Sequence, residues 1–244
     1  MSVDTLTRDY GALDATGVEA LDSAAVAAGV ETMQLMEVAG LQVARCAWTM
    51  LGDEPGRVLV IAGRGNNGGD GLVAVRHLCA WGCEVSAVVA SDNPESLHGL
   101  VNVQLRAARG SGAGVDVTAD DARVRAELET AALVVDALLG TGLRSAPRAP
   151  DSAFIQTLDT HAHVLSVDVP SGLDATTGRA FEPCVQASVT CTLTACKAGL
   201  LTPEGRAHAG RIFVADIGMP LTAWRSTGLV APLLVRGGAL IEVP

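Results

Sequence analysis

The stretch that decides the fold is Arg57–Gly71, RVLVIAGRGNNGGDG. After Arg57, residues 58–62 form a continuous apolar run, so that RVLVIA is typical of a strand buried on both faces. Five glycines among the next nine residues predict a turn in which the backbone takes positive φ and exposes its amides to an anion. An apolar pattern through Trp81 indicates a helix. Strand, glycine-rich turn and helix together predict an α/β fold with a ligand site at this turn.

Further strands and helices alternate on both sides of this unit. Residues 12–50 show helical spacing, and Gly29 divides them. Downstream, strands are expected at 84–90, 115–117, 133–138, 164–169, 187–195 and 211–215, and helices at 94–109 and 119–130. This alternation predicts an α/β fold with a parallel sheet that helices cover on both faces, preceded by an N-terminal helical segment. With no Gly/Ser/Pro-rich linker in sight, residues 1–244 are expected to form one domain.

Composition excludes several classes of protein. Hydrophobic residues make up 49% of the 244, enough for a full core, and the net charge of −10 disfavours nucleic acid as a partner. No apolar run is long enough for a membrane span, and the first ten residues do not form a signal peptide. The six cysteines lack the spacing of a metal site and are expected to be buried free thiols. A cytoplasmic protein is therefore expected.

Polar and glycine residues follow four of the expected strands directly. They occupy residues 63–71, 139–144, 168–174 and 196–199. In a parallel sheet the carboxyl ends of the strands meet at one edge, where ligands bind. All four segments are therefore expected to face one crevice.

Asn66, Asn67 and Asp70 distinguish the glycine-rich turn from a plain phosphate-binding loop. The G-x-G-x-x-G match that begins at Gly63 is weak by itself, and no GK[ST] sequence follows it. Carboxamide oxygens and a carboxylate suit a hard cation or a ribose. The alternative is a structural turn with its asparagines in left-handed conformations.

Asp136 lies inside an apolar strand, where an unpaired carboxylate would be costly. Its partner is either the backbone amides of a neighbouring loop or a cation. Ser171 and Asn67 could supply further oxygen atoms from adjacent loops. An all-oxygen set suits K⁺, Na⁺, Mg²⁺ or Ca²⁺, and one carboxylate among neutral oxygens favours a monovalent ion.

Asp168 and Lys197 are the candidate catalytic residues. Asp168 ends a strand just before Pro170, so a stiff turn would hold it at the crevice as a general acid or base, a better placement than that of Asp174. Lys197 is the single lysine beside 16 arginines. In a chain that otherwise uses arginine for its basic residues, a single lysine indicates a need for a compact ammonium group, either to bind substrate or to tune the proton affinity of Asp168. Chance would also explain it.

The motifs together resemble the NAD(P)H-hydrate epimerase family, the YjeF N-terminal domain. They are LMEVAG (35–40), VLVIAGRGNNGGDGLVAVRHL (58–78), VVDALLGTGL (134–143), VLSVDVPSGLDATTG (164–178), TLTACKAGL (192–200) and GRIFVADIGMP (210–220). The resemblance implies an α/β fold of three-layer αβα type with a Rossmann-like, mostly parallel sheet. It also implies a homodimer that binds K⁺ and interconverts the R and S epimers of the hydrated cofactors NADHX and NADPHX. It also implies pairing with a NAD(P)H-hydrate dehydratase, which is expected to be a separate protein because no fused dehydratase domain follows.

The resemblance also assigns residues. Substrate contacts fall on Asn66, Asn67, Gly68, Gly69 and Asp70, on Gly140, Thr141, Gly142, Leu143, Arg144, Ser145 and Ala146, and on Asp168. The K⁺ ligands would be Asn67, Asp136 and Ser171, and Lys197 matches the family's lysine near the site.

Two alternatives remain at this point. A non-catalytic relative, such as the binding and dimerisation modules of mRNA-decapping scaffolds, tends to lose the catalytic positions that are present here. A conventional NAD-dependent dehydrogenase expects an acid at the end of the second strand, where Asp92 lies. That class gives no reason for two asparagines in the turn or for the PSGLD sequence.

Overall fold

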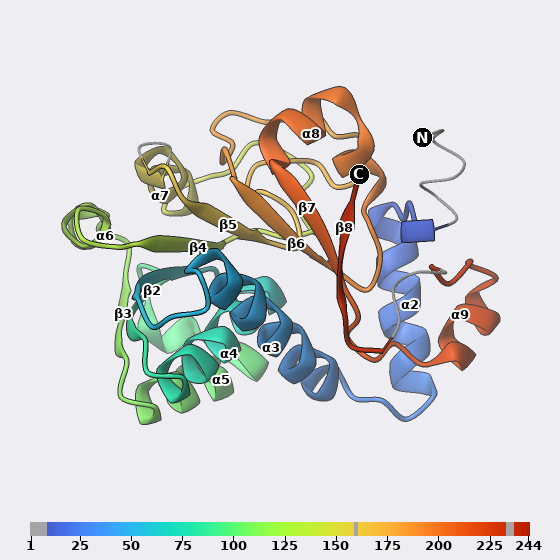
Figure 1. Ribbon diagram of the computed structural model, residues 1–244, viewed down its shortest axis with the longest axis horizontal. Coiled ribbons are helices and arrows are strands. Elements are labelled where there is room, and N and C mark those ends of the chain that lie inside the picture. Colours follow the sequence, from blue (N-terminus) through green and yellow to red (C-terminus); the bar gives the residue numbers. More distant parts are fainter. Residues whose placement is uncertain (1–8, 159–160, 233–236) are drawn as a thin grey trace.

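A single twisted sheet of eight strands organises the molecule. The computed structural model describes residues 9–158, 161–232 and 237–244. The strands are β1 Arg57–Ala62, β2 Glu84–Ala90, β3 Gly114–Thr118, β4 Leu133–Ala137, β5 Val164–Val167, β6 Val189–Leu193, β7 Arg211–Ala215 and β8 Leu240–Val243. Their order is β3-β2-β1-β4-β5-β6-β7-β8 (Figure 1), and every neighbouring pair is parallel except β7 with β8.

Helices cover both faces of this sheet. The α-helices are α2 Ala15–Ala27, α3 Thr32–Met50, α4 Asn66–Ala80, α5 Gly99–Gly110, α6 Ala122–Leu128, α7 Asp151–Leu158, α8 Pro203–Ala209 and α9 Leu221–Thr227. Two short 3₁₀ helices, η1 Pro94–Ser96 and η2 Ala198–Leu201, complete the set. Figure 1 shows α3, α4 and α5 on one face of the sheet and α6 and α7 on the other.

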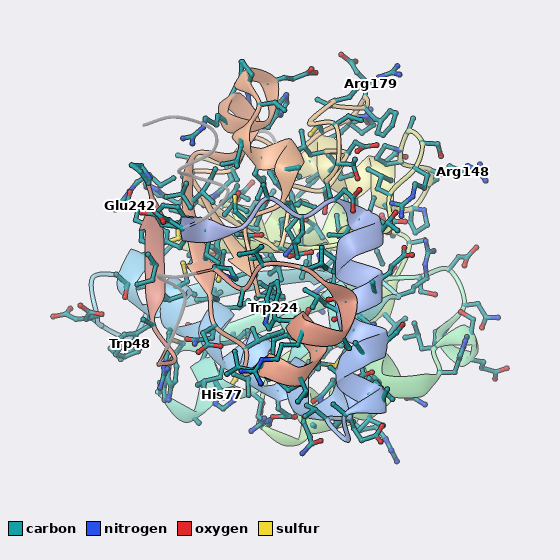
Figure 2. The ribbon with its side chains drawn as sticks, turned by 90° about the vertical axis from the view of Figure 1, so that its right-hand side faces the viewer. Trp48, His77, Arg148, Arg179, Trp224 and Glu242 are labelled. Carbon is teal, nitrogen blue, oxygen red and sulfur yellow. The ribbon has the colours of Figure 1, made fainter. Side chains whose placement is uncertain are left out.

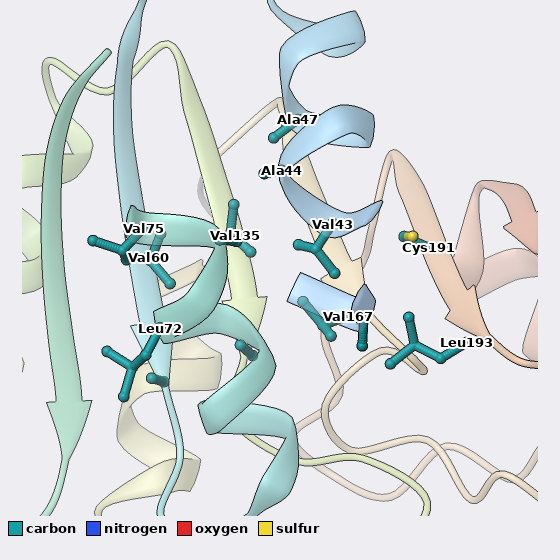
Figure 3. Close-up of a cluster of buried hydrophobic side chains, with 14 of the residues drawn as sticks. Val43, Ala44, Ala47, Val60, Leu72, Val75, Val135, Val167, Cys191 and Leu193 are labelled. Atoms are coloured by element: carbon teal, nitrogen blue, oxygen red, sulfur yellow. The ribbon is translucent and has the colours of Figure 1, made fainter. Parts of the chain in front are cut away.

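The apolar residues of β1 explain why the sheet needs cover on both faces. Val58, Val60 and Ala62 belong to the larger core with α3 and α4, and Figure 3 shows Val60 there. Leu59 and Ile61 belong to a second core with α6 and α7. All five are buried. Burying an aliphatic side chain of this size contributes roughly 1.5–3 kcal/mol, so β1 is stabilised from both sides.

The N-terminal helix α2 lies outside the three layers, on α9. Figure 2 shows α9 beside α2, and Trp224 of α9 is only 5% exposed. Just before α2, Leu13 pairs with Lys197 as a short parallel bridge, in which Leu13 N donates to Cys196 O at 3.1 Å. The segment that leads into α2 is thereby fixed to the carboxyl end of β6, beside the crevice.

The expected fold class is confirmed, and strands 57–62, 84–90 and 211–215 have the expected bounds. The glycine-rich turn differs from expectation because α4 begins already at Asn66. None of the glycines from 63 to 71 has positive φ, so the expectation that they supply that conformation is wrong. The asparagines are helical and not left-handed. Residues 94–109 form η1 and α5 instead of one helix.

Among the residues that the structure describes, no helix is both long and apolar enough to cross a membrane.

Candidate active site

A cavity of about 720 Å³ opens at the carboxyl edge of the sheet. Its floor includes the ends of β5 and β6, with Asp168, Leu193, Thr194 and Lys197. The remaining walls come from α2, α3, the start of α4 and the loop after β4. The four strand-end segments predicted from the sequence therefore meet in one place.

Close packing explains the glycines at the start of α4. A side chain at Gly68 would place its Cβ 2.0 Å from Gly63 O, and one at Gly63 would meet Leu138 O at 1.9 Å. A Cβ at Gly69 would lie 2.5 Å from Met36 Cε. The glycines thus let the helix start lie directly against the ends of β1 and β4. The first amides of α4 are left free of a side-chain cap at the cavity, where they can face an anion.

Asp168 and Lys197 form a buried ion pair on the cavity floor. Lys197 Nζ contacts Asp168 Oδ1 and donates to Leu193 O at 2.6 Å, while Leu193 N donates to the same Asp168 oxygen at 3.3 Å. Lys197 is 2% exposed. Asp168 and Thr194 both have a φ of 68°, a left-handed conformation that non-glycine residues avoid. The end of each strand is therefore strained where it turns its residues into the cavity.

Two more carboxyl groups face this pair. Burial, and then the negative charges of Asp168 and Asp22, raise the pKa of Asp70 well above its ordinary value. The Asp22 side chain, on α2, is open to the cavity, but the surrounding protein partly shields it from water and this desolvation raises its pKa. The positive charge of Lys197 opposes this rise. Both carboxyl groups therefore hold a proton more readily than an ordinary aspartate does.

Asp136 lies beneath the crevice and is fully buried. Its carboxylate accepts hydrogen bonds from Ser171 Oγ at 2.6 Å, Ser171 N at 2.9 Å, Ser166 Oγ at 2.8 Å and Leu138 N at 3.3 Å. Burial raises the pKa of Asp136, and these hydrogen bonds oppose the rise. Protein groups, including backbone amides, thus supply the hydrogen bonds that the Asp136 carboxylate needs. This agrees with the first of the two partners expected from the sequence, the backbone amides of a neighbouring loop.

The oxygen atoms expected for a cation do lie near one another. Ser171 Oγ accepts from Leu139 N at 2.8 Å, and the Asn67 side chain packs against the adjacent Gly140. Asn67 Nδ2 is buried without a hydrogen-bond partner among the described residues, so this amide can donate to an acceptor atom of a ligand, whereas only its oxygen could bind a cation. No three His, Cys, Asp or Glu side chains in the described part of the chain gather as a metal site. A neutral-oxygen site with one carboxylate suits a monovalent ion.

The structure places the remaining predicted residues as follows. The cavity is lined by Asn66, Asn67, Asp70, Gly140, Thr141, Gly142, Leu143, Arg144, Ser145, Asp168 and Lys197. Gly68 and Gly69 are buried under the helix start, and Ala146 is exposed beyond the lining. Asp136 and Ser171 lie behind the lining. Asp92 is exposed and lies outside the cavity.

Sequence analysis missed four charged residues that line the cavity. Glu19 and Asp22 come from α2, Arg64 from the turn after β1, and Asp151 from the start of α7. Asp22 follows Val18 by one helical turn and so lies on the apolar side of its helix. An acidic residue on that side was the signal that could have indicated a place in the site. Nothing local marked Asp151, because α7 was not predicted.

Comparison with known proteins places the chain in a family. Residues 32–199 match the model of the YjeF-related protein N-terminus. A protein named NAD(P)H-hydrate epimerase from Clavibacter michiganensis subsp. michiganensis is 36% identical over 236 residues, which cover 91% of this chain and 96% of that protein.

Longer relatives also match. Proteins named bifunctional NAD(P)H-hydrate repair enzyme Nnr, from Moorella thermoacetica and Hyperthermus butylicus, are 38% and 41% identical over 78% and 86% of this chain. The matched region spans only 37% and 38% of their own length. The crystal structure of the yeast protein YNL200c superposes with a TM-score of 0.79, at 23% identity, over 95% of this chain and 99% of that one, and shows a shared fold. By fold, motif order and matched length, this chain belongs to the family of YjeF-related N-terminal domains.

Proposed function

We propose that this chain is an NAD(P)H-hydrate epimerase, which interconverts the R and S forms of NADHX and NADPHX. The observation that carries the proposal is the buried ion pair of Asp168 and Lys197 on the floor of a cavity large enough for a nucleotide. The Clavibacter relative, which aligns over nearly its whole length, bears the name of this activity. A binding module would have no need for a strained, buried carboxylate at the end of β5.

The substrate carries a hydroxyl on the carbon beside the ring nitrogen. The nitrogen lone pair can expel that hydroxyl once it is protonated, which releases water and leaves a planar iminium ion. Water then adds to either face of the ring and gives up a proton, so that either epimer forms and no atom is gained or lost. The enzyme must therefore supply a proton and take one back.

Asp168 is the proposed proton donor and acceptor. Its Oδ1 is held by Lys197 and by the Leu193 amide, whereas Oδ2 makes no hydrogen bond within the described residues and is the atom proposed to move the proton. Lys197 is itself fixed by Leu193 O, so it keeps the carboxylate in one orientation. The free amides at the start of α4 would hold a phosphate of the substrate.

K⁺ is the proposed cofactor, held by Asn67, Asp136 and Ser171. Support comes from the Asn67 side-chain oxygen beside Gly140, close to the Leu139 amide that donates to Ser171 Oγ. Further support comes from the buried carboxylate of Asp136 on the adjacent strand β4, whose charge a cation would offset. When bound, K⁺ would supply a fixed positive charge beneath the crevice.

A homodimer, a dehydratase partner and a cytoplasmic location complete the proposal. None of the six cysteines, all of which lie within the described residues, forms a disulfide, as suits a reducing compartment. Light scattering of the purified protein would test the dimer.

The test of the activity is direct. Purified protein is mixed with the R epimer of NADHX, and formation of the S epimer is followed by chromatography with and without K⁺. Asp168→Asn should abolish conversion while substrate still binds. Asp92→Asn makes the same change outside the cavity and should convert normally. Failure of the unaltered, folded protein to exceed the spontaneous rate would overturn the proposal in favour of a binding module.

A further inference from the structure

Each basic side chain that lines the cavity is paired with a carboxylate from a different element. Among the described residues these pairs are Lys197 with Asp168, Arg64 with Asp151, and Arg144 with Glu19. A dinucleotide brings phosphate groups into this cavity, and phosphate competes with carboxylate for a guanidinium. The question is which pair can exchange its carboxylate for a phosphate.

Burial excludes two of the pairs. Lys197 is 2% exposed and donates also to a backbone carbonyl, so it cannot leave Asp168. The Asp151 side chain is 7% exposed, and its Oδ1 already lacks a partner among the described residues. Drawing Arg64 away would leave a buried carboxylate with no counter-charge, which is strongly unfavourable.

The pair of Arg144 and Glu19 lies instead at the mouth of the cavity. Its side chains are 54% and 68% exposed, and Arg144 Nη2 lies 3.1 Å from Glu19 Oε1. Exposed pairs of this kind are weak, so the partners separate easily. Arg148, later in the same loop, points outward into solvent (Figure 2) and does not line the cavity.

Arg144 is the fixed member of this pair. Its Nη1 donates to Thr141 O at 2.6 Å and to Leu143 O at 3.1 Å, which holds the guanidinium on its own loop. Within the described residues, Glu19 makes no second hydrogen bond or ion pair, and its carboxylate reaches Arg144 from α2, on the other side of the mouth. A phosphate that enters the cavity would therefore replace Glu19 and leave Arg144 in place.

We propose that Glu19 is a specificity-determining residue: it occupies Arg144 in the free protein, and a phosphate of the dinucleotide displaces it. This inference rests on the proposed function for the identity of the ligand. Glu19 then opposes weakly bound anions, because a ligand must offer Arg144 a better partner than a carboxylate. Phosphate does so through its charge and its match to the guanidinium fork.

The test measures binding and so does not depend on turnover. NADH, NADPH and ADP are titrated calorimetrically against the unaltered protein and against Glu19→Gln, Arg144→Gln and the double variant. Glu19→Gln should tighten binding about two- to fivefold, the range expected for freeing one exposed pair. Arg144→Gln should weaken binding, and adding Glu19→Gln to it should restore little, because Glu19 acts through Arg144.

Glu54→Gln is the matched control. It removes the same charge at the opposite edge of the sheet, before β1, and should leave the affinities unchanged. If Glu19→Gln tightens the binding of all three probes equally, the diphosphate is the group that displaces Glu19. If it tightens the binding of NADPH alone, the additional phosphate of NADPH is that group. Both results support the proposal. Three results would overturn the proposal. They are unchanged or weaker binding by Glu19→Gln, the same tightening when Arg144→Gln is also present, and no binding of any probe to the unaltered protein. An inactive protein that still shows the Arg144-dependent gain would overturn only the epimerase assignment.

Discussion

Replacing Lys197 by Met tests whether the ion pair on the cavity floor stabilises the fold as well as the reaction. Methionine keeps most of the length of the lysine stem but removes the charge and the donor to Leu193 O. The change leaves the Asp168 carboxylate, only 11% exposed, without its counter-charge. Breaking a buried pair from one side is worth about 3–5 kcal/mol. Since a domain is stable by about 5–15 kcal/mol, roughly a fifth or more of the total would be lost.

Urea unfolding followed by circular dichroism measures this loss. The double variant with Asp168→Asn should recover part of it, because a neutral amide is less unfavourable than a buried charge. Arg57→Met is the control: it breaks an exposed pair with Glu84 and should lower the free energy of unfolding by less than about 1 kcal/mol. A loss below about 1 kcal/mol for Lys197→Met would refute the reasoning. An equal loss with and without Asp168→Asn would show that packing, and not charge, is responsible.

Three further results are expected. Gly68→Ala places a methyl group 2.0 Å from a backbone oxygen and should destabilise the protein by about 1–3 kcal/mol in urea unfolding. The control, Gly69→Ala, meets only the end of a flexible side chain and should change the free energy of unfolding by less than about 1 kcal/mol. Asp70→Asn should raise the Tm at pH 8, because burial raises the pKa of Asp70 in the folded state, whereas the unfolded chain holds the ionised carboxylate at no penalty. The gain in Tm should shrink as the pH falls toward the pKa of an ordinary carboxyl group. A gain in Tm that stays constant with pH would contradict this reasoning. Cys196, whose pKa burial raises to about 12, should resist a thiol reagent at pH 8, while half-buried Cys79 should react first by mass spectrometry.

The central strands could be predicted from the sequence because each is a short apolar run bounded by glycine or charge. β1 is the clearest example, since its bounds follow directly from RVLVIA. β8 could not be predicted, because Leu240–Val243 is short, only partly buried and stabilised by pairing with β7. The start of α4 was misplaced for a related reason: glycines that signal a turn locally are tolerated in a helix when close packing requires them.

The candidate site was predictable only where a strand ends. Asp168 and Lys197 follow apolar strands, so the meeting of strand ends at one edge placed them together. Glu19 and Asp22 belong to α2, whose position depends on α9 and on the bridge at Leu13. No local pattern in the sequence encodes such long-range contacts, and for that reason one wall of the cavity was missed.

The attachment of α2 also bears on how the protein is made. Its main helical neighbour, α9, begins about 190 residues after α2 ends. At 5–20 residues per second, a ribosome would need roughly 10 to 40 s to deliver that partner. During this interval the apolar side of α2 lies uncovered on the nascent chain, and the cavity lacks a wall. The site can therefore close only after α9 has been synthesised, and the uncovered helix is a natural target for chaperones that hold nascent chains.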